Sequence, residues 1–306
     1  MSYQPRRSAP PLLLSALAIL IAACSAAGGA SPAPATPGTS AAPSVAPATT
    51  SDPDVIEHKT GATDIVLRYE EGGGFIMPAF TAAAVPHFTL YGDGTVIFRN
   101  PMAEPPPAEG SVFKMNPLRT VRLSEDQIQE LLLIALGEGG LAVARENYSN
   151  DMIADAGTAI FTIEAGGIKK TVSVYALGLE MEGVPDAPAR AAFKKLADRL
   201  SDFDQGGTIA TDEYRPEAYR GVLFEAPGIE AADIRDWPWP DINPGDFTPD
   251  PDPNANQFPH RRMTIEEVDA LGIKDYQGGF QNLALRSSDG KTWQFSLRPL
   301  LPGEPD

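Results

Sequence analysis

Residues 155–176 read DAGTAIFTIEAGGIKKTVSVYA, and this stretch predicts the fold most directly. Two runs rich in β-branched and aromatic residues, 158–165 and 168–177, flank the pair Gly166-Gly167. Such runs on either side of two glycines are typical of a β-hairpin, because glycine adopts the positive φ that a tight turn requires. The stretch therefore predicts two antiparallel strands that pair with each other.

Further strands are predicted on both sides of this hairpin. Residues 64–71 alternate apolar and polar side chains, as a half-buried strand does. The glycine run 72–74 follows and indicates a strand kink or bulge. The segments HFTLYGDGTVIFR (87–99) and NLALRSSDGKTWQFSLR (282–298) each place Asp-Gly between two apolar runs and predict two more hairpins. Residues 218–226 indicate one further strand.

Helix signals separate these strands. The segment LSEDQIQELL (123–132) can form a capping box in which Ser124 and Gln127 satisfy each other's backbone N–H groups. A second helix is predicted over residues 186–201, where apolar residues recur at helical spacing. A short third helix begins at Thr264 with the same capping pattern. Antiparallel hairpins packed with about three helices make the predicted fold class α+β.

The organisation of the chain follows from changes in composition. Residues 1–23 predict a signal peptide, and residues 24–54 predict a disordered linker because they are almost wholly Ala, Ser, Pro, Thr and Gly. Residues 55–208 hold the first predicted α+β domain. Residues 209–306 form a strand- and proline-rich C-terminal region, either a separate domain or part of the same one.

The N-terminus has the pattern of an export signal. Two arginines precede the short apolar run PLLLSALAILIAAC, which ends at Cys24. Residues 21–24, Ile-Ala-Ala-Cys, resemble the lipobox of bacterial lipoprotein precursors. The resemblance implies cleavage between Ala23 and Cys24, a thioether-linked diacylglycerol on Cys24 and an N-acyl chain such as palmitate, with no other cofactor. It places the protein on the extracytoplasmic face of the cell membrane, where the lipid anchor makes the membrane its partner.

Composition bears on the function and on how the fold is stabilised. The chain carries 24 basic and 41 acidic residues, for a formal net charge of −17. Nucleic-acid binding is excluded as a function because phosphate contacts need clustered Lys and Arg. Cys24 is the only cysteine, so no disulfide is expected and the fold must rest on its core.

The sequence contains no recognisable catalytic motif. His58, His87 and His260 are far apart and none has a metal-binding spacing, so we interpret each as a surface or loop histidine. No nucleophile elbow, dinucleotide fingerprint or phosphate-binding loop is present. We therefore predict that the protein is not an enzyme. Carboxylates are abundant, however, and sequence alone does not show whether two of them meet in space.

Trp237 and Trp239 form the candidate binding surface. They alternate with proline, and aromatic rings interleaved with proline hold an extended shape at low entropic cost. One interpretation is that they bind an extracytoplasmic protein or a glycan. The other is that they pack onto the protein's own sheet.

We predict no metal site, with one calcium candidate kept open. Its alternating acidic and amide residues are Asp250, Asp252, Asn254 and Asn256. A calcium loop of the EF-hand type needs glycine where Ala255 stands and glutamate where Arg261 stands, so the pattern is incomplete.

Residues 65–203 resemble the emfourin-type modules, which are small protein inhibitors of thermolysin-like metalloproteases. The resemblance rests on GGGF (72–75), the helix at 123–132, the hairpin at 155–176 and a closing amphipathic helix, in that order. It implies a protein-binding module, and inhibition of an extracellular metalloprotease is one form of such binding.

The leading hypothesis is a non-catalytic binding or structural module that a lipid anchor and a flexible tether present outside the membrane. The first alternative is an inhibitor of an extracellular metalloprotease. The second is a hydrolase that uses paired carboxylates.

Overall fold

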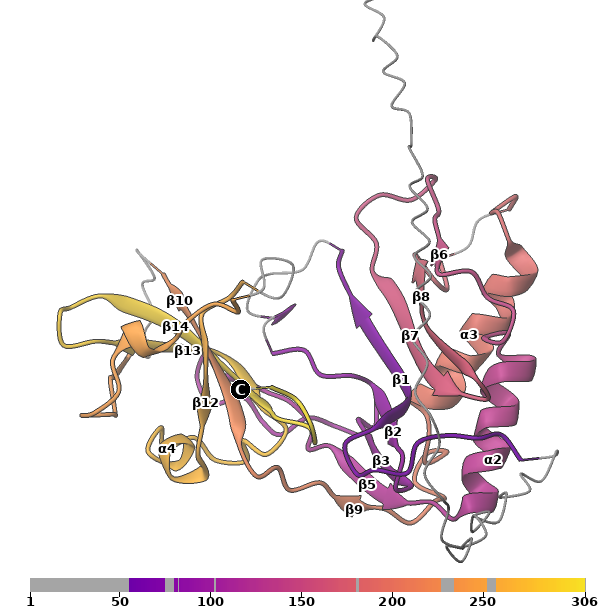
Figure 1. Cartoon of the computed structure of the whole chain (residues 1–306). Coiled ribbons are helices and arrows are strands. Elements are labelled where there is room, and N and C mark those ends of the chain that lie inside the picture. Colours follow the sequence, from indigo (N-terminus) through magenta and orange to yellow (C-terminus); the bar gives the residue numbers. More distant parts are fainter. Residues whose placement is uncertain are drawn as a thin grey trace, which may run out of the picture. The chain divides into compact units, whose positions relative to one another are not determined.

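A computed structural model describes residues 55–74, 80–81, 83–101, 103–179, 182–226, 234–251 and 257–305 (Figure 1). These residues belong to one unit that spans residues 51–306. The described part contains 14 β-strands and three α-helices, and most strand pairs are antiparallel, so the predicted α+β class is confirmed. The predicted signal peptide and linker lie outside the described residues, as do Ala23 and Cys24. No helix in the described ranges combines the length and apolar character needed to cross a bilayer.

The first sheet has eight strands in the described part, in the order β6-β8-β7-β1-β2-β3-β5-β9. Its strands are β1 (Ile65–Gly72), β2 (Phe88–Tyr91), β3 (Thr95–Phe98), β5 (Arg119–Arg122), β6 (Asn147–Tyr148), β7 (Thr158–Ala165), β8 (Ile168–Tyr175) and β9 (Asp212–Glu213). All neighbours are antiparallel except the short β6, which pairs with β8 in parallel.

The two hairpins predicted in this region are confirmed. Strands β7 and β8 pair along their whole length, and the turn glycines 166–167 have φ values of 60° and 73°. Strands β2 and β3 pair around a turn in which Gly94 has a φ of 88°. A Cβ atom at Gly94 would lie only 2.7 Å from the Leu123 carbonyl oxygen, so both space and conformation require glycine there.

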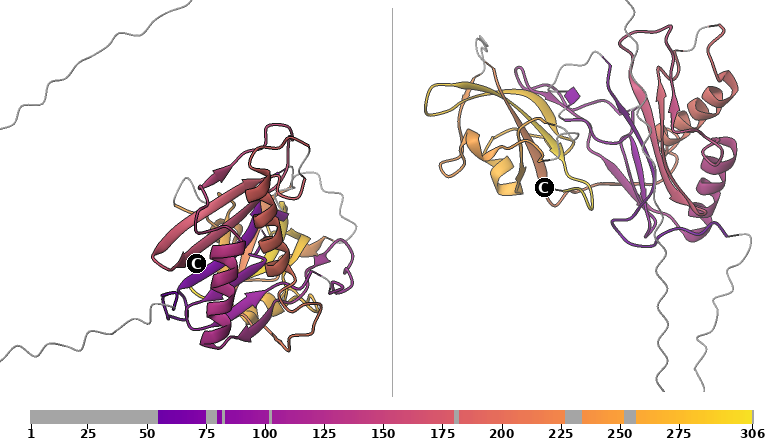
Figure 2. Two further views of the ribbon diagram at one scale, coloured as in Figure 1. Left: turned by 90° about the vertical axis from the view of Figure 1, so that its right-hand side faces the viewer. Right: turned by 45° about the horizontal axis from the view of Figure 1, so that its top comes forward.

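Two helices cover one face of this sheet, as the left view of Figure 2 shows. Helix α2 (Glu125–Leu133) begins with the predicted capping box, in which Ser124 Oγ accepts from the Gln127 N–H at 3.4 Å. It continues into a π-helical turn (Ile134–Glu138). Helix α3 (Ala187–Ser201) matches the second predicted helix. Between the helices and the sheet lies a core of large buried side chains that includes Leu67, Phe88, Phe98, Leu132, Phe161, Phe193 and Leu200.

Arg190, on the first turns of α3, is fully buried in this layer. Its guanidinium donates to the carbonyl oxygens of Tyr175 at 2.9 Å, Ser149 at 2.6 Å, Tyr148 at 3.3 Å and Pro185 at 3.2 Å. No described carboxylate pairs with it. Carbonyl dipoles therefore satisfy the charge, and the side chain ties the ends of β6 and β8 to the helix.

The second sheet has six strands in the described part, in the order β11-β13-β14-β10-β12, and β4 pairs with β13 off this path. Its strands are β4 (Phe113–Lys114), β10 (Tyr219–Glu225), β11 (Arg235–Asp236), β12 (His260–Met263), β13 (Phe280–Arg286) and β14 (Thr292–Pro299). The third predicted hairpin is confirmed as β13–β14. The third predicted helix is α4 (Ile265–Asp269), which starts with the Thr264 capping box.

The core of the second sheet takes its bulk from irregular segments as well as from strands. Trp239 and Phe247 come from the proline-rich connection between β11 and β12, and both pack on Phe295 of β14, with ring centroids 5.6 Å and 6.1 Å apart. Proline prevents regular pairing in such a segment but leaves its aromatic side chains free to fill the core.

Side chains and backbone from both sheets meet around residues 99–118. The Arg99 guanidinium donates to the carbonyl oxygens of Asn116 and, at 3.1 Å, Gly278. Burial lowers the pKa of Arg99 to about 10, so it stays charged at neutral pH. A small apolar cluster is made of Tyr91, Ile97, Leu118 and Leu301.

Candidate functional site

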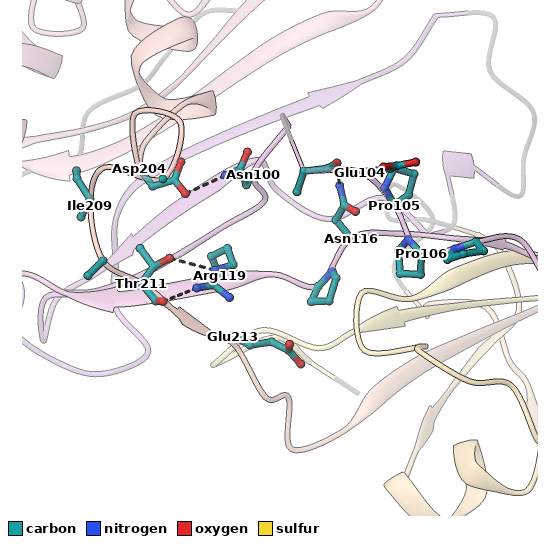
Figure 3. A pocket seen from close by; sticks show the side chains of 15 residues that line it. Asn100, Glu104, Pro105, Pro106, Asn116, Arg119, Asp204, Ile209, Thr211 and Glu213 are labelled. Atoms are coloured by element: carbon teal, nitrogen blue, oxygen red, sulfur yellow. Dashed lines mark hydrogen bonds between the residues drawn. The ribbon is translucent and has the colours of Figure 1, made fainter.

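A cavity with a volume of about 910 Å³ lies between two loop segments (Figure 3). One segment runs from the end of β3 to the start of β5, and the other follows α3 and ends in β9. The lining residues are Asn100, Ala103, Glu104, Pro105, Pro106, Pro107, Asn116, Pro117, Arg119, Asp204, Gly207, Ile209, Ala210, Thr211 and Glu213.

Proline shapes the first wall. Residues 105–107 are three consecutive prolines, which have no N–H groups to donate and therefore do not extend the sheet. Asn116 fixes this loop because its Nδ2 donates to the Ala103 carbonyl oxygen at 2.6 Å. The Oδ1 atom of Asn116 is buried and receives no hydrogen bond from the described residues.

A tight turn after α3 forms the second wall and positions Asp204. The Asp204 carbonyl oxygen accepts from the Gly207 and Ile209 N–H groups at 3.1 Å and 3.0 Å. Its side chain is only 3% exposed, and Oδ2 accepts from Asn100 Nδ2 at 2.9 Å. Figure 3 shows these two side chains pointing toward one another. Oδ1 of Asp204 receives no hydrogen bond, and the carboxylate forms no ion pair, within the described ranges.

Arg119 forms the third side of the cavity. It lies on β5 beside Glu213 of β9, and its Nε donates to Thr211 Oγ1 at 3.0 Å. A second guanidinium nitrogen donates to the Thr211 carbonyl oxygen. Two donor groups of Arg119 therefore hold β9 and its preceding loop against β5.

The lining has an excess of negative charge and no nucleophile–base pair. Glu104, Asp204 and Glu213 are the carboxylates and Arg119 is the cation, which leaves a formal charge of −2. No Ser, Cys or His is among the lining residues. Figure 3 shows that Glu104, Asp204 and Glu213 come from different segments of the cavity wall.

The two tryptophans predicted as a binding surface do not line this cavity. Trp239 is 5% exposed and donates from its indole N–H to the Glu267 carbonyl oxygen at 2.7 Å, so it is a core residue. Trp237 is partly buried and donates to the Ile242 carbonyl oxygen at 2.6 Å. Both tryptophans line a separate cavity of about 480 Å³, together with Arg286. Packing onto the protein's own sheet therefore accounts for Trp239, and Trp237 stays a binding candidate.

The calcium candidate falls mostly outside the described residues. Only Asp250 is described, while Asp252, Asn254 and Asn256 are not. Among the described residues, no group of three or more His, Cys, Asp or Glu side chains is arranged to hold a metal ion.

His58 and His87 lie outside the strands and helices, as the loop interpretation expects, and the His87 side chain is 37% exposed, whereas His260 departs from that interpretation because it lies in β12. The His58 side chain is 4% exposed and its Nε2 lies 3.2 Å from Glu125 Oε1 at the start of α2. His87 stacks on Tyr69 with centroids 5.4 Å apart, and its Nε2 lies 3.7 Å from Glu71. Burial lowers the pKa of His87. Both histidines pack against partners distant in sequence, which no local pattern indicates.

Sequence reasoning also missed Asn100, Asn116 and Asp204. Asn100 and Asp204 are 104 positions apart and meet only because the fold brings the loop after β3 against the turn after α3. The one local signal is the proline run at 105–107, whose residues lack the N–H groups that strand pairing needs and therefore indicate an irregular connection.

Comparisons with protein-family models, with curated proteins and with solved structures found no match for this chain. The geometry of the cavity therefore carries the functional argument.

Proposed function

We propose that this chain is a lipid-anchored extracytoplasmic binding protein without catalytic activity, in which the cavity beside Asp204 is the ligand site. The anchor is Cys24, and residues 25–54 act as a flexible tether for the folded part. An extracytoplasmic protein or a glycan fragment is the class of partner to which this location gives access.

The observation that carries the binding function is the cavity itself. Its volume of about 910 Å³ lies within the range of about 300–1,000 Å³ that is typical of small-ligand sites. Apolar proline faces and a few fixed polar groups line it, which is the usual division between contact area and specificity. The polar groups hold one another in place, so the site is pre-formed.

Binding and turnover are separated by one experiment. The full chain, purified in detergent, is screened by thermal shift against small amines, amino-acid amides, oligosaccharides and short peptides. Each compound that raises the melting temperature is then incubated with the chain and analysed by mass spectrometry. We expect stabilisation without chemical change. A product that accumulates with time, and is lost on Glu104→Gln or Glu213→Gln substitution, would instead establish the carboxylate-dependent hydrolase.

The anchor has its own test. We expect cells that express the full chain to incorporate labelled palmitate into it and to retain it in the membrane fraction. The Cys24→Ser variant should lose the label and leave that fraction. A chain that stays membrane-bound and uncleaved after this substitution would show that residues 1–23 act as an anchor helix.

Protease inhibition is the second candidate. The first strand, the helix, the hairpin and the closing helix that suggested the emfourin-type modules correspond to β1, α2, β7–β8 and α3, which follow one another in that order in the described chain. Titration of the full chain against a thermolysin-like protease measures this directly. Stoichiometric loss of protease activity supports inhibition, and undiminished activity at a large excess of the chain excludes it for that enzyme.

A further inference from the structure

Asp204 is a buried carboxylate for which the described residues provide no counter-charge. Asp204 is only 3% exposed, yet no described Lys, Arg or His forms an ion pair with it. Removing a charged group from water without a counter-charge is costly, and buried carboxylates are normally paired. The single described side-chain donor is the neutral amide of Asn100. The carboxylate thus lines a cavity while its charge is left unbalanced.

The other polar groups of the cavity accentuate this imbalance. Asn116 adds a second buried acceptor, Oδ1, that receives no hydrogen bond from the described residues. Glu104 and Glu213 are exposed at the other walls and add two negative charges. The only cation, Arg119, already directs two of its nitrogens at Thr211. The lining therefore has a net negative charge and two acceptor atoms without donors among the described residues. A ligand that carries N–H donors and a positive charge would complement it.

We infer that this cavity binds a cationic group, an alkylammonium or a guanidinium, whose charge pairs with Asp204. The inference rests on the proposed binding function and names its ligand class. A cation supplies several N–H donors and a full positive charge where Asn100 supplies a neutral amide. The methylene stem that carries such a group fits against the proline faces at 105–107. The chain's net charge of −17 favours the approach of cations.

Two sources present this chemistry. One is a basic side chain within a peptide or protein, and the other is a free diamine. The probes are N-acetyl-arginine amide, N-acetyl-lysine amide and 1,4-diaminobutane. N-acetyl-citrulline amide is the matched control because it replaces the guanidinium of the arginine probe with a neutral urea of nearly the same shape.

Isothermal titration of the full chain in detergent is the test. We expect at least one cationic probe to bind, and the citrulline probe to bind at least tenfold more weakly than the arginine probe. Affinity should fall as salt is raised, since a charge pair that is partly accessible is screened. Preference for the amino-acid amides points to a peptide source, and preference for the diamine points to a free amine. Equal binding of the arginine and citrulline probes would overturn the inference.

Variants locate the binding. Asp204→Asn keeps the size of the side chain and an acceptor for Asn100, and we expect it to weaken the cationic probes about tenfold or more. Asp151→Asn, which removes one exposed charge after β6, at the opposite edge of the first sheet from β9, should leave affinity unchanged. If Asp204→Asn fails to fold, Glu104→Gln combined with Glu213→Gln provides the second measurement, with an expected loss of several-fold. Unaltered affinity in these variants would contradict the proposed site.

Failure of this inference is distinguishable from failure of the proposed function. If neutral oligosaccharides or peptides bind and lose affinity on Asn116→Ala substitution while no cationic probe binds, the cavity is a ligand site and the cation assignment is wrong. If the cationic probes are chemically converted, the non-catalytic function is wrong although the cation assignment stands.

Discussion

The two sheets bury their apolar faces by different means. The first uses long strands such as β1, β7 and β8, and two helices of regular amphipathic pattern cover it. The second fills much of its core with aromatic side chains from irregular, proline-rich segments. Periodic patterns in the sequence therefore reveal the long strands and the two helices of the first region, whereas the second depends on individual anchor residues whose role emerges only in three dimensions.

The largest expected effect comes from removing one such anchor. Trp239→Ala should destabilise the second sheet by about 4 kcal/mol, because a buried indole leaves a large cavity and its hydrogen bond to Glu267 is lost. Hydrogen exchange monitored by mass spectrometry would show faster exchange in β10, β13 and β14. The partly buried Trp237→Ala serves as the control and should cost less. Equal acceleration in β1 and β7 would mean that the sheets unfold as one unit.

The matching test of the first region removes its buried guanidinium. Arg190→Met should cost about 3 kcal/mol, because carbonyl oxygens of Tyr175 and Ser149 lose their donors within a dry layer. Urea unfolding measures the change. Arg145→Met, at an exposed ion pair with Asp186, should stay within about 0.5 kcal/mol of the wild type. Similar costs for both arginines would show that the burial of Arg190 contributes nothing specific.

How much of each region the sequence predicts depends on whether its signals are local. The hairpin β7–β8 and the Ser124 capping box follow from local patterns, since turn glycines and cap residues act within a few positions. The two-residue strands β4 and β9 have no such pattern, because pairing partners more than about 90 positions away induce them. The same holds for the candidate site, whose Asn100–Asp204 contact spans 104 positions.

A smaller effect is expected where the two regions meet. Arg99→Met removes the hydrogen bonds that join β3 to the carbonyl oxygens of Asn116 and Gly278, and it should cost about 2 kcal/mol. We also expect the exchange rates of the two sheets to become less correlated. If unfolding stays equally cooperative while stability falls, the apolar cluster around Leu118 carries the coupling instead.

The smallest effect concerns acidity. Burial lowers the pKa of His87 below its usual value of 6.5, while Glu71 opposes and Arg99 reinforces that shift. The unfolded chain therefore binds more protons at this residue than the folded chain, so stability is highest above pH 6.5 and falls as the pH drops below it. Urea midpoints at pH 7.5 and 5.5 should differ less in His87→Gln than in the wild type. An unchanged difference would assign the acid sensitivity to other groups.

Each sheet includes one short strand from the other half of the chain, and this limits where the chain can be divided into fragments. β9, which lies after residue 208, closes the edge of the first sheet by pairing with β5, and β4 from the earlier half pairs with β13 of the second sheet. A chain that ends at residue 208 lacks β9, so β5 becomes the edge strand and its backbone groups on that side are unpaired. Unpaired edge strands promote edge-to-edge aggregation. We expect fragment 55–208 to self-associate in analytical ultracentrifugation while the uncut chain does not. The two halves of this chain are therefore not expected to serve as separate modules in other proteins.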